Sequence, residues 1–277
     1  MRSESQRTQG CPGRGGAAGR LLRRGASVVL VALVLVWVGA VSADGLPDTV
    51  ERVEPSVVSV GTYESTRSPR VQHRGTGFVV GDGRLVVTNE HVLPESLDEG
   101  NRERLVVISG HGRDTSMHHA EVVGRTGETD LALLRISAPS LPALRLGDSD
   151  AVRVGEKLAM TGYPIGMILG LYPATHRVSV AARTPMAIPA SRSSELDGGR
   201  VAALRRGAPM VFQLDATAYP GNSGSPVYRI DSGEVVGIIN QVFVQGGREA
   251  AVGRPSGISY AIPSAHVRPL LERHGRP

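Results

Sequence analysis

From Val57 onward, short runs of β-branched and other apolar residues alternate with turn residues, mainly Gly, Asp and Pro. Few segments show the spacing of an amphipathic helix, and many short strands separated by turn signals are typical of a β-sandwich or barrel. The predicted strands are residues 57–63, 75–80, 85–88, 105–109, 121–125, 131–136, 157–161, 177–182, 211–216, 225–228, 235–243 and 257–261.

The strands fall into two groups of similar size, because residues 141–155 have no strand pattern. We expect a crossover there between two β-barrels, the first over about residues 50–140 and the second over about 155–263. Ser264 is placed to cap a short C-terminal helix at about 264–275.

Two further segments, 165–176 and 183–209, lack strand character. Long segments of this kind in a compact domain tend to be functional or mobile.

The N-terminal segment has the features of an export signal. Three arginines precede an apolar run at residues 28–38, and small residues up to Ala43 suit signal peptidase. Residues 25–43 are also uncharged and just long enough to span a bilayer. We expect 1–43 to be a signal peptide or a membrane anchor, and residues 44–277 to lie in the periplasm or outside the cell.

The charge distribution argues against nucleic-acid binding. The net charge is +5, but residues 1–43 hold six arginines and one glutamate, and the remainder holds 25 basic and 25 acidic side chains. The body is therefore neutral and carries no basic footprint. The single cysteine, Cys11, lies in the leader, so the body can form no internal disulfide.

The most distinctive stretch is Y-P-G-N-S-G-S-P-V-Y at residues 219–228. Glycines on both sides of Ser223 permit a tight turn that exposes the hydroxyl. The N–H groups of Gly221 and Ser223 could then converge where a tetrahedral oxyanion would sit, with Asn222 between them. The alternative is an ordinary surface turn, which the same residues also favour.

Two upstream residues complete a catalytic pattern. His91 directly follows a predicted strand, and Asp130 begins the apolar strand T-D-L-A-L-L-R-I. Singly, an exposed histidine and a turn aspartate would be ordinary. Together with Ser223 they give the chain order His, Asp, Ser, which chymotrypsin-like proteases use and subtilisins and α/β-hydrolases do not.

At this point the chain resembles the protease domain of the HtrA/Deg family of trypsin-like serine proteases over about residues 50–275. The resemblance rests on V-E-P-S-V-V-S-V at Val53, T-G-F-V-V at Thr76, T-N-E-H-V at Thr88, T-D-L-A-L-L-R-I at Thr129, L-G-D-S-D-A-V-R-V-G-E-K at Leu146, G-Y-P-I-G at Gly162, L-D-A-T-A-Y-P-G-N-S-G-S-P at Leu214 and G-I-S-Y-A-I-P-S at Gly257.

The resemblance implies an all-β, chymotrypsin-like double β-barrel and a serine endopeptidase with an acyl-enzyme intermediate. It makes His91 the general base, Asp130 its orienting partner and Ser223 the nucleophile. The Gly221 and Ser223 amides would form the oxyanion hole. It further implies exported, unfolded polypeptide substrates, no cofactor or metal, and a homotrimer.

The sequence departs from the family pattern in several places. Ser225 stands where the family usually has glycine, and Glu90 stands where a small or amide residue is commoner. Segment 183–209 has no clear match. Because the chain ends soon after the final helix, we expect a protease domain without the PDZ domain usual in the family.

The expected substrate pocket has Thr217 as its floor and Ala218, Ile238, Ile239 and Asn240 as neighbours. None of these side chains is charged, and burying an unpaired substrate charge is unfavourable. The sequence therefore predicts cleavage after Val, Ala, Ile or Leu.

Other enzyme classes fit less well. A V8-like glutamyl endopeptidase shares G-N-S-G-S-P-V, but that resemblance implies a histidine where this chain has Ile239. An α/β-hydrolase using Ser223, Asp231 and His266 would need glycine at Ser225 and alternating strands and helices.

Two other interpretations stay open. A non-catalytic binding or chaperone module of the same fold would carry the same residues. A metal site at His111, His118, His119 and Glu121 is disfavoured, because neighbouring residues point to opposite faces of a strand.

Overall fold

The computed structural model describes residues 45–164, 170–186, 208–217, 219–240 and 257–274. These residues belong to one compact unit, Asp44–Pro277. The leader predictions for residues 1–43 lie outside the described residues. Among the helices that the structure describes, none is long and apolar enough to cross a membrane.

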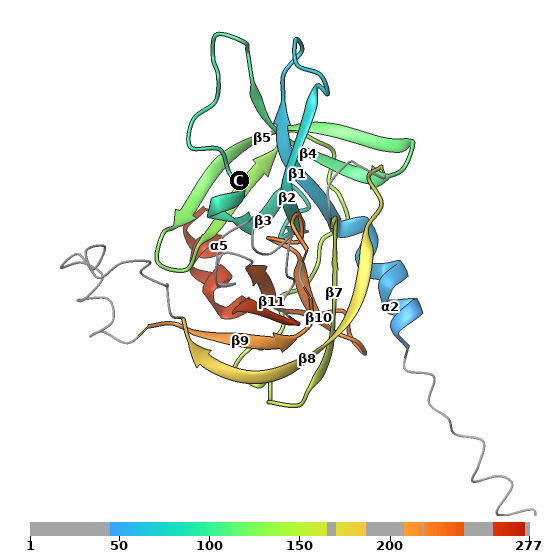
Figure 1. Cartoon of the computed structure of the whole chain (residues 1–277), viewed down its shortest axis with the longest axis vertical. Helices are drawn as coiled ribbons and strands as arrows, with labels where there is room; N and C mark the ends of the chain where they lie inside the picture. The colour runs from blue at the N-terminus through green and yellow to red at the C-terminus, as the bar shows by residue number, and fades with distance from the viewer. Residues whose placement is uncertain (1–44, 165–169, 187–207, 218, 241–256, 275–277) are drawn as a thin grey trace, which may run out of the picture. The chain divides into compact units, whose positions relative to one another are not determined.

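The first barrel is closed and all its pairings are antiparallel, with strand order β1-β2-β3-β6-β5-β4. Figure 1 shows it in blue to green. Its strands are β1 (Val57–Tyr63), β2 (Val71–Val80), β3 (Leu85–Asn89), β4 (Arg104–His111), β5 (Asp114–Thr126) and β6 (Leu131–Ile136).

The second barrel is also closed and antiparallel, with strand order β10-β11-β12-β9-β8-β7. Its strands, drawn in yellow-green to red in Figure 1, are β7 (Lys157–Gly162), β8 (Ala174–Pro185), β9 (Met210–Asp215), β10 (Pro226–Arg229), β11 (Val235–Asn240) and β12 (Ile258–Pro263).

Each barrel has its own aliphatic core. Val58, Val86 and Leu134 are among the fully buried residues of the first, and Leu158, Phe212 and Ile239 are among those of the second. A third buried cluster, including Phe78, Leu133, Tyr228 and Ile238, contains residues from both barrels. Shared apolar burial therefore packs the two barrels against each other.

Short helices lie at the two ends of the described part of the chain. Helix α2 (Leu46–Val53) buries Leu46, Thr49 and Val53 at helical spacing and was not predicted. It leads into the 3₁₀ turn η1 (Glu54–Ser56). At the C-terminus, the 3₁₀ turn η5 (Ser264–Val267) precedes α5 (Arg268–His274), which contacts β5 and β6.

The double barrel confirms the predicted fold class, and all twelve predicted strands have a counterpart. Ser264 was wrongly expected to cap the last helix, because its hydroxyl donates to the carbonyl of Gly147 instead. Segments 165–176 and 183–209 were taken as strand-free, but β8 extends from Ala174 to Pro185 and includes one end of each. Residues 165–169 and 187–207 lie outside the described residues.

Candidate active site

The turn that carries His91 lies where β3 ends. Residues Glu90–Val92 form the 3₁₀ turn η2, which is closed by a hydrogen bond from Leu93 N to Glu90 O. At its start, Glu90 N donates to the carbonyl of Asp130 (3.1 Å), and His91 N donates to Asp130 Oδ1 (2.9 Å). The backbone at His91 is therefore hydrogen-bonded directly to Asp130.

Asp130 adopts a left-handed backbone conformation, with φ of 51°. This is uncommon for a residue other than glycine, although aspartate tolerates it better than most. Asp130 is the last residue of the turn at 127–130 and directly precedes β6. Its carbonyl also accepts a hydrogen bond from the side-chain amide of the fully buried Asn89 (3.1 Å).

The three residues expected to form a triad lie in hydrogen-bond contact. His91 Nδ1 is 2.6 Å from Asp130 Oδ2, and His91 Nε2 is 2.8 Å from Ser223 Oγ. Since a carboxylate can only accept, the network assigns the proton of a neutral imidazole to Nδ1 and leaves Nε2 to accept from the serine. This arrangement can take the proton of Ser223 as its oxygen attacks a carbonyl carbon.

The Ser223 loop begins with a tight turn. Asn222 N donates to Tyr219 O (3.0 Å), Pro220 is in the second position, and Gly221 has φ of 99° in the third, as in a type II turn. Gly224 also has positive φ (88°), and a Cβ there would collide with the carbonyl of Thr76. Glycine is thus needed on both sides of the nucleophile.

The first barrel holds this loop in place through Thr76. Thr76 Oγ1 donates to Gly221 O (2.7 Å) and accepts from Tyr163 N (3.0 Å), while Thr76 N donates to Ser223 O (2.8 Å). Among the described residues, the backbone N–H groups of Gly221 and Ser223 have no backbone acceptor. The oxyanion hole stays a prediction.

The residues expected to line the substrate pocket lie in several different surroundings. Ile238 and Ile239 are fully buried, the first in the cluster between the barrels and the second in the second-barrel core. Asn240 Nδ2 donates to Asp130 Oδ2 (2.6 Å), so its amide joins the catalytic cluster. Thr217 is half-buried, and Ala218 lies outside the described residues. The pocket and its aliphatic preference stay predictions.

The two departures from the family pattern have different surroundings. Glu90 forms an ion pair with Arg125 (3.6 Å), which links η2 to β5. Ser225 is fully buried, and its hydroxyl packs where a Cβ on Gly162 would collide. Within the described ranges, the Ser225 hydroxyl and the amide atoms of Asn222 have no hydrogen-bond partner.

Several supporting residues were missed by sequence reasoning. Asn89 lies in the quoted string T-N-E-H and Thr76 in G-T-G-F, but only the folded chain shows that each contacts a residue distant in sequence. Among the described residues, no group of three or more His, Cys, Asp or Glu side chains is placed to hold a metal ion.

Comparison with known proteins agrees with this geometry. Residues 75–238, more than half of the chain, match the family described as trypsin-like peptidase domain. The probable periplasmic serine endoprotease DegP-like of Halomonas elongata is 33% identical over 194 residues, which cover 68% of this chain and 32% of that protein. Serine protease HTRA1 of Xenopus tropicalis is 32% identical over 236 residues, covering 83% of this chain and 43% of that one.

A solved structure of the HtrA-type protease AlgW with a tripeptide superposes with a TM-score of 0.58 at 26% identity, covering 83% of this chain and 64% of the other. The chain spans about a third to two-fifths of the length of the curated relatives. From the matched family, the double barrel and these relatives, we conclude that the chain belongs to the trypsin-like serine proteases of the HtrA type.

Proposed function

We propose that this protein is a serine endopeptidase that cleaves polypeptides through a Ser223–His91–Asp130 triad and an acyl-enzyme intermediate. The observation that carries the proposal is the imidazole of His91, which lies between Asp130 Oδ2 at 2.6 Å and Ser223 Oγ at 2.8 Å. Both distances are within reach for proton transfer.

In the proposed mechanism, His91 Nε2 accepts the Ser223 proton as Oγ attacks the scissile carbonyl, and then delivers it to the leaving amine. Asp130 holds the Nδ1–H tautomer and stabilises the imidazolium that forms. The amides of Gly221 and Ser223 would donate to the oxyanion, and such a donor typically lowers the barrier by about 3–4 kcal/mol. In the second step, His91 removes a proton from a water molecule, which then attacks and hydrolyses the acyl-enzyme ester.

We propose exported, unfolded proteins as substrates and the periplasm or cell exterior as the location. The names of the DegP-like relatives support a periplasmic location. The arginine-flanked apolar run at residues 28–38 provides either a signal peptide or an anchor. Fusing residues 1–50 to a reporter active only after export should give signal, and N-terminal sequencing should distinguish cleavage near Ala43 from retention.

Specificity for small or medium aliphatic residues before the cut is the corresponding proposal for the pocket. Each buried methylene contributes about 0.8 kcal/mol, so the preference should be graded. If Thr217 is the floor, Thr217→Asp should shift cleavage towards basic residues in a peptide library analysed by mass spectrometry. A dominant Arg, Lys or Glu before the cut would contradict the assignment.

Assembly as a homotrimer is proposed from the family resemblance alone. Light scattering over a range of concentrations tests it, and a monomer at every concentration would refute it.

The decisive test of the catalytic proposal uses Ser223→Ala with Ser232→Ala as control. Ser232 is an exposed serine in the β10–β11 turn. Ser223→Ala should lose proteolysis of casein by about a millionfold and should not react with a fluorophosphonate probe, whereas Ser232→Ala should keep both. A folded wild-type protein that never reacts with the probe would instead favour the non-catalytic binding or chaperone module.

A further inference from the structure

Strand β2 contains a β-bulge two residues before Thr76. Its pairing with β1 runs from Val57↔Phe78 to Val60↔Gly75 and resumes at Gly61↔His73, so the β1 register skips Arg74, which is the extra residue of the bulge. Bulges change the direction of a side chain and are frequent next to active sites.

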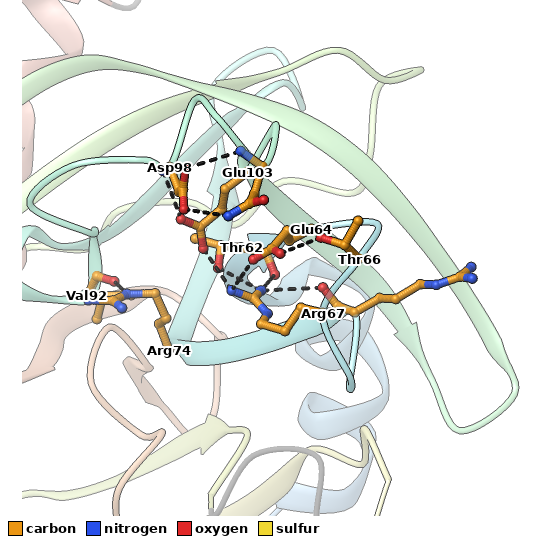
Figure 2. Close-up of polar contacts among 10 residues, drawn as sticks. Thr62, Glu64, Thr66, Arg67, Arg74, Val92, Asp98 and Glu103 are labelled. Atoms are coloured by element: carbon orange, nitrogen blue, oxygen red, sulfur yellow. Dashed lines mark hydrogen bonds and ion pairs between the residues drawn. The ribbon is translucent and has the colours of Figure 1, made fainter.

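The bulge turns the Arg74 side chain towards the chain just after the catalytic histidine. Arg74 Nε donates to Val92 O (2.7 Å), and Arg74 Nη2 donates to Leu93 O (3.3 Å), in partly buried surroundings. Figure 2 shows the guanidinium of Arg74 against Val92, separate from the larger polar cluster around Arg67. These two carbonyls lie at the C-terminal end of η2, where carbonyl groups have no partner within the turn.

The turn that carries His91 is therefore fixed at both ends. Asp130 binds its first two N–H groups, and Arg74 binds carbonyls at the other end. The residue after the bulge is equally confined, because a Cβ on Gly75 would lie 2.6 Å from the side chain of Val92 and 3.0 Å from Ser223 O. Movement of Val92 is thereby coupled to the strand that also contacts the nucleophile loop.

We propose that Arg74 is a positioning residue for catalysis: through Val92 and Leu93 it holds the imidazole of His91 in line between Asp130 and Ser223. The inference rests on the proposed triad, but the geometry it asserts can be measured without turnover. A guanidinium fits this role because its fixed fork can donate to two acceptors at once, which an ammonium group does less well.

A purely structural role would have different consequences. If Arg74 only stabilised the fold, its loss would lower the free energy of unfolding and leave the folded enzyme as fast as before. Arg67 supplies the matched control, because it is another partly buried arginine of the same barrel. It pairs with Glu103 at 2.9 Å and bonds to Thr62, with no contact to η2 in the hydrogen bonds and ion pairs of the described residues.

The experiment compares the full chain as wild type, Arg74→Met, Arg74→Lys and Arg67→Met. Two readouts are the rate at which an alkyl fluorophosphonate modifies Ser223 and the low-field proton NMR signal of His91 Nδ1–H, assigned by its loss in His91→Gln. Arg74→Met should react about 10–100-fold more slowly, as small misplacements of a catalytic group do, with a shifted or broadened signal. Arg74→Lys should recover part of both, and Arg67→Met should match the wild type.

A folded Arg74→Met protein with the wild-type signal and rate would overturn the proposal, as would an equal loss in Arg67→Met. If Arg74→Met does not fold, Arg74→Gln takes its place with the same expected direction, since its amide can still donate to one carbonyl. A wild type that never reacts with the probe would refute the proposed function alone, and the NMR signal would still decide the role of Arg74.

Discussion

The two halves of the active site are held in different ways. On the side of the base, both ring nitrogens of His91 and both carboxylate oxygens of Asp130 have protein partners, including Asn240 from the second barrel. On the side of the nucleophile, hydrogen bonds to backbone carbonyls hold the loop. Within the described ranges, the amide of Asn222 and the hydroxyl of Ser225 are buried without partners.

The difference shows which contacts each barrel contributes to the site. Each barrel holds a candidate catalytic residue of the other: Asn240 on β11 donates to Asp130, and Thr76 on β2 donates to the loop of Ser223. The base side is fixed by charge-assisted bonds, which are about twice as strong as neutral ones. The nucleophile side depends on glycine conformations and neutral bonds, and should respond more weakly to single substitutions.

Among the variants that test this comparison, Asp130→Asn should have the largest effect, because it keeps the shape but reverses the hydrogen-bonding preference towards His91 Nδ1. Turnover should fall by about 10⁴-fold, because the imidazole adopts the wrong tautomer. Asp231→Asn, at an exposed turn, is the matched control and should be neutral. Casein cleavage measures the turnover of both variants. A loss of less than tenfold in Asp130→Asn would show that Asp130 does not orient the base.

Much of the fold and of the candidate site could be predicted because both depend on local sequence patterns. The strand β1 and the strand β6 were expected at the bounds they have, since apolar runs between turn residues mark them clearly. Asn240 was expected at the substrate pocket, and its hydrogen bond to Asp130 was not foreseen, because strand alternation alone does not tell which residues of the other barrel a side chain meets. Arg74 was not recognised, because a bulge depends on the register of two strands.

The next effect concerns His73, a buried histidine of the first barrel. Burial lowers its pKa to about 4, and its Nδ1 lies 2.7 Å from Ser59 Oγ. The ordinary pKa of histidine is 6.5, so below that pH His73 is protonated in the unfolded chain but stays neutral in the folded chain. Stability should therefore fall as the pH drops from about 6.5 to about 4, by roughly 3 kcal/mol in total.

Urea unfolding at several pH values should show a shallower loss in His73→Gln than in the wild type. His111→Gln, at an exposed histidine, serves as the control. Equal slopes in all three proteins would mean that His73 takes up its proton in the folded state as well.

Removing the bond from Asn240 to Asp130 should have a smaller effect on the rate than Asp130→Asn. A hydrogen bond to a charged group contributes about 1.5–3 kcal/mol, which corresponds to roughly 10–100-fold in rate if it acts fully in the transition state. Asn240→Ala tests this through kcat/KM, and Asn240→Ser, which can still donate, should retain more activity. Identical losses in the two variants would point to packing rather than to the donated bond.

Thr76→Val should weaken the other connection between the barrels. The partly buried Gly221 O and the buried Tyr163 N would lose their partner, at a cost of about 1–3 kcal/mol of stability. Thr76→Ser keeps the hydroxyl and is the control. Chemical denaturation measures the difference, and a Thr76→Val protein as stable as Thr76→Ser would show that water replaces the threonine hydroxyl.

The smallest effect is expected at Ser225, where substitution should raise the stability or leave it unchanged, whereas the substitutions above lower the stability or the activity. Its hydroxyl is fully buried and, among the described residues, without a partner, so the native chain already bears the cost of desolvating it. Ser225→Ala removes that group and leaves only a small void, because the two side chains differ by one oxygen atom. Stability should stay unchanged or rise by up to about 1 kcal/mol, with kcat/KM within twofold of the wild type. Loss of more than about 1 kcal/mol in denaturation would show that the hydroxyl has a partner, such as a buried water bridging to Asn222.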